Sequence, residues 1–385
     1  MSKAEYKRLG DYIREVNVRN KDLKVTKLVG LTIDKAFIPS VANVIGTDLS
    51  NYKVIRKEQF ACSLMQVSRD GKMPVAMFEE DEAIMSPAYP MFEVVDKTIL
   101  MPQYLMMWFS RSEFDREASY YAVGGVRGSL TWEDFCNMRL PIPSITRQRE
   151  IVSEYETLTN RIRLNNQMIQ HLEATAQTLY RKTFVDGIDK ENLPEGWRMG
   201  TFTDVVRISG GGTPDTSDVC FWNGDIPFFT PADSTNKFYC IKTEKSLTTE
   251  GLNNCSSKLY EKNSTFVTAR GTVGEVSLAS KKMAMNQSCY ALLSKDSYVP
   301  FYIHQLSVET ISSLKEEAVG AVFSALVTKD FEIKEVIIPP VTLMEEYNSV
   351  VSNIYNNALI RQNENSKLTE LQSLLLAKMG QLKQS

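Results

Sequence analysis

Polar and cationic side chains gather in turn-rich segments of the second half of the chain. Glycine, proline and asparagine punctuate residues 209–215, 221–233, 268–276 and 285–292, and such composition predicts exposed loops. Arginine hydrogen-bonds guanine through two donors, glutamine pairs with adenine, and lysine contacts phosphate. The side chains that could make such contacts are Thr213, Lys237, Arg270, Thr272 and Gln287.

The first half offers a similar but smaller set, Arg69, Lys72 and Arg127. Basic residues are also in local excess, with eight Lys/Arg against four Asp/Glu over 234–282 and nine against five over 1–35. A positive patch of this kind suits the phosphate backbone of a nucleic acid. Ordinary solvated surface is the alternative interpretation for each of these residues.

Residues for catalysis are scarce. The chain has two histidines, His171 and His304, and its six cysteines do not stand at metal-ligand or disulfide-framework spacing, so we predict no metal site and no catalytic residues. Gly210–Gly212 lacks the spacing of a phosphate-binding loop and is expected to be a flexible loop. We find no methyltransferase tetrapeptide, helicase P-loop or nuclease carboxylate cluster, so any catalysis belongs to partner chains.

Composition indicates a soluble globular protein. The 385 residues are 43% hydrophobic, which is enough apolar surface for two cores, and the net charge is only -3. No apolar run approaches the length of a membrane span, so we expect no membrane association and a cytoplasmic location, which the dispersed cysteines also favour. The sequence pI of about 5.7 is the best support for a protein that does not bind nucleic acid.

An internal repeat sets the expected architecture. Residues 124–184 align without a gap on residues 320–380, with 14 of 61 positions identical, where chance gives about 6%. Upstream the similarity is weaker but in the same order, with 10–14 facing 203–207 and 85–88 facing 285–288. The chain therefore contains one module twice, each a globular part followed by a long helix.

Each predicted helix carries an apolar seam with heptad spacing. Asn165 interrupts the first seam, and Arg361 with Asn365 interrupts the second. The residues expected to pair the helices are Ile151, Leu158, Ile162, Asn165, Leu172, Leu179, Ile354, Arg361, Leu368 and Leu375.

We expect the two helices to pack on each other within one chain. In an antiparallel pair the polar residues of the two seams meet near the centre, whereas a parallel homodimer would place each Arg361 against its own copy. A homodimeric coiled coil specified by Asn165 remains the alternative.

The predicted fold class is α+β. Two globular domains of mixed structure are joined by two long antiparallel coiled-coil helices in a pseudo-twofold repeat. The expected segments are 1–143 for the first domain, 144–190 for the first helix and linker, 191–340 for the second domain and 341–385 for the second helix.

The chain resembles the specificity subunits of type I restriction-modification systems over its whole length. The resemblance lies in LPEGW at 193–197, in 210–214 with 221–233, in ARGTVG at 269–274, and in the boundary motifs at 140–152 and 337–347. The first module lacks the segment that corresponds to 222–227. Arg147 and Gln148 of the first boundary motif become Leu343 and Met344 in the second.

The resemblance implies that each globular part is a target recognition domain for one half of a split DNA sequence. It also implies that the helices set the unread spacer and dock two modification (methyltransferase) subunits, with two restriction (endonuclease and translocase) subunits in the larger complex. S-adenosylmethionine, ATP and Mg would be bound by those partners and not by this chain. The alternatives are a stand-alone DNA-binding scaffold or antiphage adaptor, and a protein that binds other proteins only.

Overall fold

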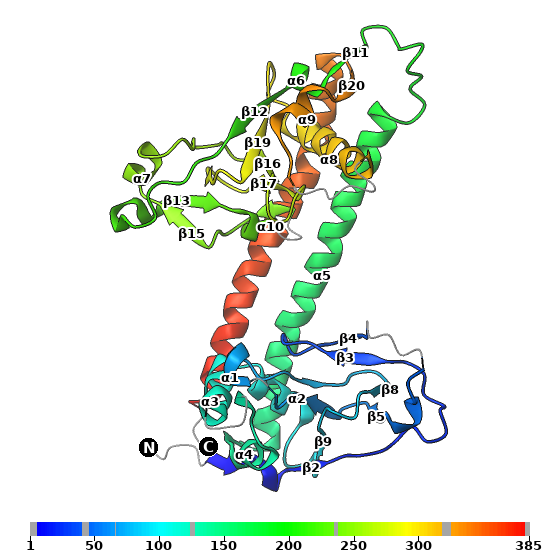
Figure 1. Cartoon of the computed structure of the whole chain (residues 1–385), viewed down its shortest axis with the longest axis vertical. Helices are drawn as coiled ribbons and strands as arrows, with labels where there is room; N and C mark the ends of the chain where they lie inside the picture. The colour runs from blue at the N-terminus through cyan, green and yellow to red at the C-terminus, as the bar shows by residue number, and fades with distance from the viewer. Residues whose placement is uncertain are drawn as a thin grey trace. The chain divides into compact units, whose positions relative to one another are not determined.

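The structure is a computed structural model that describes residues 6–40, 46–65, 67–123, 128–234, 238–317 and 325–381 (Figure 1). The chain forms two compact units, one of Met1–Arg161 with Leu368–Ser385 and one of Ile162–Lys367. Each unit therefore contains a globular part together with portions of both long helices, α5 (Ile145–Phe184) and α10 (Val341–Met379).

The first unit is built on an antiparallel sheet with strand order β2-β9-β6-β7, accompanied by three two-stranded ribbons, β1-β10, β3-β4 and β5-β8. The strands are β1 (Tyr6–Arg8), β2 (Ile13–Glu15), β3 (Val29–Leu31), β4 (Phe37–Pro39), β5 (Lys53–Arg56), β6 (Phe60–Cys62), β7 (Val75–Met77), β8 (Glu82–Met85), β9 (Met91–Val94) and β10 (Arg139–Pro141).

Helices pack on this sheet through a dense aromatic core. They are α1 (Val67–Asp70), α2 (Pro102–Phe109), α3 (Ser112–Ala122) and α4 (Trp132–Asn137). Phe92 stacks on Phe60 with ring centroids 5.0 Å apart, and it meets Phe109 edge to face at 6.1 Å. These rings are fully buried, and burial of such large apolar groups is the main source of folding free energy.

The second unit contains a five-stranded sheet, β12-β19-β16-β17-β14, and a three-stranded sheet, β15-β13-β18, with the pair β11-β20 beside them. The strands are β11 (Arg198–Thr201), β12 (Val206–Gly210), β13 (Trp222–Phe229), β14 (Tyr239–Cys240), β15 (Lys245–Leu247), β16 (Thr265–Thr268), β17 (Val276–Ala279), β18 (Ala284–Met285), β19 (Cys289–Ser294) and β20 (Glu335–Ile338).

Helix α8 (Pro300–Glu317) covers one face of the larger sheet, and the shorter helices are α6 (Phe202–Val205), α7 (Thr249–Asn253) and α9 (Thr328–Glu332). The core of this unit extends from the sheet through α8 to both long helices. Phe301 stacks on Tyr355 of α10 with centroids 4.1 Å apart, and Tyr302 meets Phe184 of α5 at 5.0 Å.

The two globular parts share one strand order. The order β2-β9-β6-β7 of the first unit corresponds to β12-β19-β16-β17 of the second, which adds β14 at the end. The terminal ribbons also match, because Arg8 faces Arg139 in one and Thr201 faces Glu335 in the other. The weak sequence similarity upstream of the 61-residue repeat therefore reflects equivalent strands.

The long helices pack antiparallel within each unit. In the second unit Asn165 contacts Asn365, and the Tyr347 hydroxyl donates to the Ala176 carbonyl at 3.0 Å. In the first unit the Gln372 amide donates to the Thr159 hydroxyl at 2.7 Å.

The seam residues lie inward along these contacts. Among the positions expected to pair the helices, Ile151 and Asn165 are buried, while the other eight are partly buried: Leu158, Ile162, Leu172, Leu179, Ile354, Arg361, Leu368 and Leu375. Four polar side chains of α5, which we call its outer face, are exposed: Arg149, Glu156, Arg163 and Gln170.

Gln148 explains one difference between the two boundary motifs. Its side chain is fully buried, accepts a hydrogen bond from the Met101 amide at 2.9 Å and donates to the carbonyls of Ile99 and Pro143 at 2.7 and 2.8 Å. Met344, the equivalent residue of the second copy, is 3% exposed and belongs to the apolar core. The first turn of each helix is thus anchored by a buried side chain, polar in one unit and apolar in the other.

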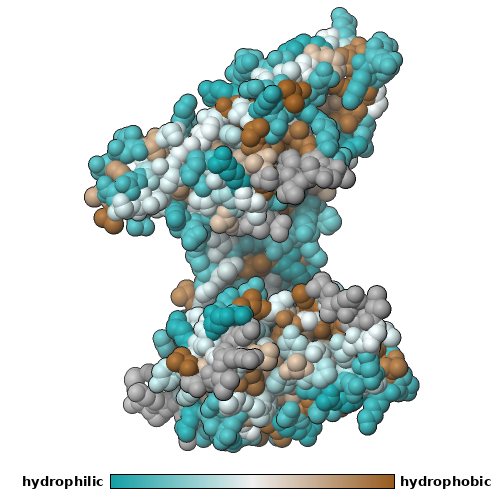
Figure 2. Space-filling model, viewed as in Figure 1, coloured by the Kyte–Doolittle hydropathy of each residue, from teal (hydrophilic) through white to brown (hydrophobic). Residues whose placement is uncertain are grey.

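Within the residues that the structure describes, no helix combines the length and the apolar character needed to cross a bilayer. On the face seen in Figure 2, apolar residues form small separate patches among hydrophilic ones.

Candidate nucleic-acid interface

Several connections of the second unit meet at one end of its larger sheet. The Gly212 amide donates to the Met285 carbonyl at 3.0 Å, which joins the segment after β12 to the segment before β19. The Ala269 amide donates to the Ser288 carbonyl at 2.7 Å, which adds the connection between β16 and β17. The loops that carry Thr213, Arg270, Thr272 and Gln287 are thereby brought together.

Thr213 and Gln287 interact directly. The Thr213 hydroxyl donates to the side-chain carbonyl of Gln287, although the two residues are far apart in sequence. Gln287 is exposed and Thr213 is partly buried. A glutamine held through its oxygen keeps its amide group pointed outward, and that group donates to acceptors on base edges.

The glycines of this loop permit close packing against neighbouring segments. A Cβ on Gly211 would lie 2.1 Å from the Asn286 carbonyl oxygen, and one on Gly212 would lie 2.2 Å from the Ser256 hydroxyl. Neither position has room for a side chain. These residues therefore fix the loop that presents Thr213.

Arg270 and Thr272 are exposed on the connection between β16 and β17. Gly271 and Gly274 have φ of 82° and 77°, a left-handed conformation that suits glycine. The Lys315 ammonium of α8 donates to the Gly274 carbonyl at 2.9 Å, and the Gly274 amide donates to Thr268 at 2.8 Å. The connection is therefore held at its base and leaves the Arg270 side chain free to extend.

Arg69 and Lys72 lie on the equivalent connection of the first unit, between β6 and β7. In both units a leucine closes this connection by the same hydrogen bond, because Leu130 donates to Leu64 at 2.8 Å and Leu326 donates to Ala269 at 2.9 Å. The structure thus places Arg69 and Lys72 of the first unit, and Arg270 and Thr272 of the second, on equivalent connections.

The charges of Arg69 and Lys72 are paired in the first unit. Arg69 contacts Asp70 at 2.6 Å, and Lys72 contacts Asp34 at 3.0 Å. The Arg69 guanidinium lowers the pKa of the Asp70 carboxyl through hydrogen bonding. Both cations remain substantially exposed, so an incoming phosphate would compete with these carboxylates. The other two candidates, Arg127 and Lys237, lie outside the described residues.

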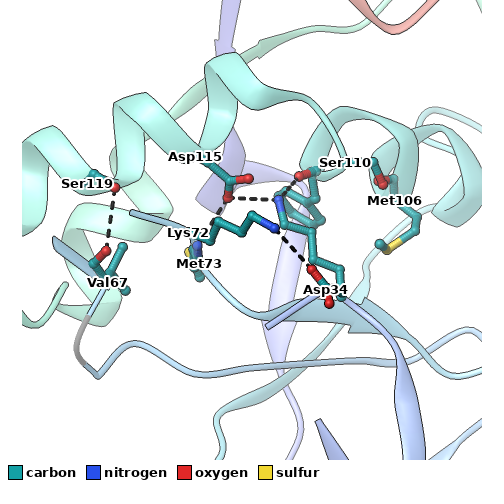
Figure 3. Close-up of polar contacts among 10 residues, drawn as sticks. Asp34, Val67, Lys72, Met73, Met106, Ser110, Asp115 and Ser119 are labelled. Carbon is teal, nitrogen blue, oxygen red and sulfur yellow. Dashed lines mark hydrogen bonds and ion pairs between the residues drawn. The ribbon is translucent and has the colours of Figure 1, made fainter. Parts of the chain in front are cut away.

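A buried ion pair beside Lys72 was not predicted from the sequence. The Lys35 ammonium lies 2.8 Å from Asp115, and both side chains are mostly buried. Figure 3 shows Asp115 close to Lys72, Met73 and Asp34. The partners are 80 residues apart in sequence, and no local motif connects them.

His304, Cys62 and Cys289 are buried in the cores of the two units. His304 is buried against Phe238 and Tyr355, and burial lowers its pKa to about 3. Burial also raises the pKa of the Cys62 and Cys289 thiols, which disfavours reactive thiolates. Among the described residues no group of three His, Cys, Asp or Glu side chains is arranged to hold a metal ion.

The chain is similar in sequence to known proteins. Residues 194–370 match the type I restriction modification DNA specificity domain. The chain is 28% identical over 195 residues to the type I restriction enzyme MjaIX specificity subunit of Methanocaldococcus jannaschii, covering 49% of this chain and 45% of that relative. It is 24% identical over 372 residues to the HindI specificity subunit of Haemophilus influenzae, covering 78% and 81% of the two chains.

Among solved structures, the chain is similar to the S subunit of a type I restriction-modification system from M. genitalium. The TM-score is 0.59 and the identity is 13%, with 99% of this chain and 96% of that chain covered. This similarity shows a shared fold.

The two globular parts share a strand order, and each carries candidate residues on the same connection. Residues 194–370 thus match a type I restriction modification DNA specificity domain, and the chain is similar to type I restriction enzyme specificity subunits.

Proposed function

We propose that this chain binds double-stranded DNA and that each unit reads one half of a bipartite target. The observation that carries the proposal is the shared position of the candidate residues. Arg69 and Lys72 of one unit, and Arg270 and Thr272 of the other, stand on the same connection of the same sheet. A protein that reads two half-sites needs two equivalent surfaces of this kind.

The long helices would set the spacer between the half-sites. α5 has 40 residues and α10 has 39, so each would extend for roughly 60 Å at about 1.5 Å per residue. That length exceeds one turn of B-DNA, roughly 34–36 Å. We take the two helices to be an antiparallel coiled coil on a pseudo-twofold axis, which the packing of their polar residues supports.

The chain would act as the non-catalytic part of a larger complex. The exposed outer face of α5 would dock two modification subunits, and two restriction subunits would join them. S-adenosylmethionine, ATP and Mg would be bound by those partners. This division of labour suits a methyltransferase that flips its adenine out of the helix, because another chain must then hold the sequence register.

Selection from random duplexes tests the proposal. The purified full-length chain, alone and with its modification subunit, should enrich a motif with two defined halves and a fixed unread spacer. Affinity should fall steeply as salt rises, because phosphate contacts release counterions. Failure to enrich any motif in either form, or salt-independent retention, would contradict DNA recognition.

Exchange of residues 197–335 for those of a relative separates the roles of the units. One half of the motif should change, while the other half and the spacer stay the same. A hybrid in which both halves change would argue against two independent readers.

A further inference from the structure

The turn between β3 and β4 is fixed against the candidate interface of the first unit. The ribbon pairs Leu31 with Phe37, and the turn closes with the Thr32 amide donating to Ala36 at 2.9 Å. Lys35 has φ of 62°, a left-handed conformation that is uncommon for a residue with a side chain. The turn is therefore a defined conformation rather than a loose loop.

Lys35 attaches this turn to the helical layer. Its ammonium contacts the Asp115 carboxylate, donates to the Phe109 carbonyl and lies 5.1 Å from the centre of the Phe114 ring. The Lys35 and Asp115 side chains are only 9% and 13% exposed. A buried ion pair contributes little net stability after desolvation, but it fixes the geometry of the groups that carry it.

Asp115 also ties the turn to the connection between β6 and β7. Its carboxylate accepts a hydrogen bond from the Met73 amide at 3.1 Å, immediately after Lys72. One buried carboxylate thus positions both the turn and the connection that carries Arg69 and Lys72 (Figure 3). The turn and the candidate interface form a single surface.

Asp34 is the residue that this turn presents. Its side chain is 77% exposed and lies 3.0 Å from the Lys72 ammonium. A carboxylate on a DNA-binding surface repels phosphate, so it weakens general binding. It is suited instead to accept a hydrogen bond from the exocyclic amino group of cytosine in the major groove.

We propose that Asp34 is a specificity-determining residue that reads a cytosine in the half-site of the first unit, and that Lys72 positions it. The ion pair with Lys72 offsets the repulsion of phosphate and holds the carboxylate at the surface. Lys72 keeps donor hydrogens for a backbone phosphate beside that base. This inference rests on the proposed DNA recognition and adds a base identity to it.

The test is selection from random duplexes by the full-length chain and its Asp34→Ala variant. The variant should lose a cytosine preference at one position of one half-site, by about 10-fold, and keep every other position. Its affinity for unrelated DNA should not fall. Asp34→Asn retains an acceptor oxygen and should lose less of the preference.

Glu80→Ala is the matched control. Glu80 is an exposed carboxylate of the same unit that also pairs with a lysine, Lys27, on the segment between β7 and β8. This variant should select the wild-type motif. Replacement of the cytosine by a pyrimidinone that lacks the amino group should weaken wild-type binding about 10-fold and leave Asp34→Ala unaffected.

An unchanged motif for Asp34→Ala would overturn the assignment, and so would equal weakening of all positions in that half-site. A wild-type chain that selects no motif would instead contradict the proposed DNA recognition itself. A wild-type motif that Asp34→Ala leaves intact contradicts only the role of Asp34, so the two failures are distinguishable.

Discussion

The Arg361 guanidinium donates a hydrogen bond to the Asn165 side-chain oxygen at 3.1 Å, and the two residues stand 196 positions apart, at equivalent places in the two repeat copies. The Asn165 amide donates in turn to Glu364 at 3.0 Å and Asn365 at 2.9 Å. Asn165 is 1% exposed. Within the second unit, these contacts join the two antiparallel helices through buried and partly buried polar side chains.

Asn165→Ala should destabilise the second unit by about 1–3 kcal/mol, because it removes the hydrogen bonds that join the buried Asn165 side chain to Arg361, Glu364 and Asn365. The double variant Asn165→Leu with Arg361→Leu should recover part of the loss, since both polar partners are removed together. Urea unfolding measures both. Asn357→Ala, on the exposed side of α10, is the control, and an equal effect there would contradict this role for Asn165.

Arg270→Ala should weaken DNA binding about 10-fold or more and relax the motif at one position, a guanine. Arg270→Lys should recover affinity better than selectivity, because lysine lacks the planar fork of donors. Arg207, exposed on β12, provides the control, since Arg207→Ala removes the same charge away from the convergent loops. Unaltered affinity and motif in Arg270→Ala would remove this residue from the interface.

Thr213→Val should relax the motif at the same position as Gln287→Ala, because the hydroxyl orients the glutamine amide. The double variant should therefore lose no more than Gln287→Ala alone. Thr216→Val changes an exposed residue of the same segment and should have no effect. Additive losses in the double variant, measured by competition binding, would show that the two residues act independently.

The stability of the second unit should decrease with acidification in a way that depends on His304. Burial lowers the folded-state pKa of this histidine to about 3 from its ordinary 6.5. Below pH 6.5 the unfolded chain therefore takes up a proton that the folded chain does not. The stability that His304 contributes is complete above that pH and is lost progressively toward pH 3, by at most about 1.4 kcal/mol per pH unit.

His304→Leu should weaken the dependence of the stability of the second unit on pH. Calorimetric unfolding of both proteins from about pH 7.5 to about pH 4.5 measures the difference between their pH dependences of stability. The carboxyl groups contribute equally in both proteins, so their contribution cancels from this difference. Parallel curves for the two proteins would show that His304 does not titrate on unfolding.

Deletion of one heptad from α5, with the matching heptad of α10, should move the half-sites closer by roughly 10 Å, or about three base pairs. Both half-sequences should persist in the selected motif. An unchanged spacer would refute the role of the helices as a ruler.

The helix seams could be predicted from the sequence because their periodicity is local. Ile151, Ile169 and Ala176 lie on the seam of alternating four- and three-residue steps and are buried, and the alignment of the two copies pairs Asn165 with Arg361. Burial of apolar side chains every three or four residues is a strong signal, since it requires no knowledge of the rest of the fold.

The candidate interface could be predicted only in part from the sequence. Turn composition pointed to Arg270 and Gln287, but Arg69 and Arg270 share no alignable motif, and their equivalence emerges only from the strand order. The Lys35 and Asp115 pair depends on long-range packing of a ribbon against a helix. The spacing of Gly211 and Gly212 also gave no sign that their backbones are packed closely against other segments.

Tyr6 at the start of the first strand donates its hydroxyl to the Gly380 carbonyl, just beyond the last helix, at 3.0 Å. A short loop would therefore be enough to connect the end of α10 to the start of β1. The same fold should then tolerate an opening between Ile188 and Pro194, in the connection after α5. The order of the two globular parts along the chain therefore depends only on where the termini are placed. Circular permutants with the two parts in reverse order should recognise the same DNA.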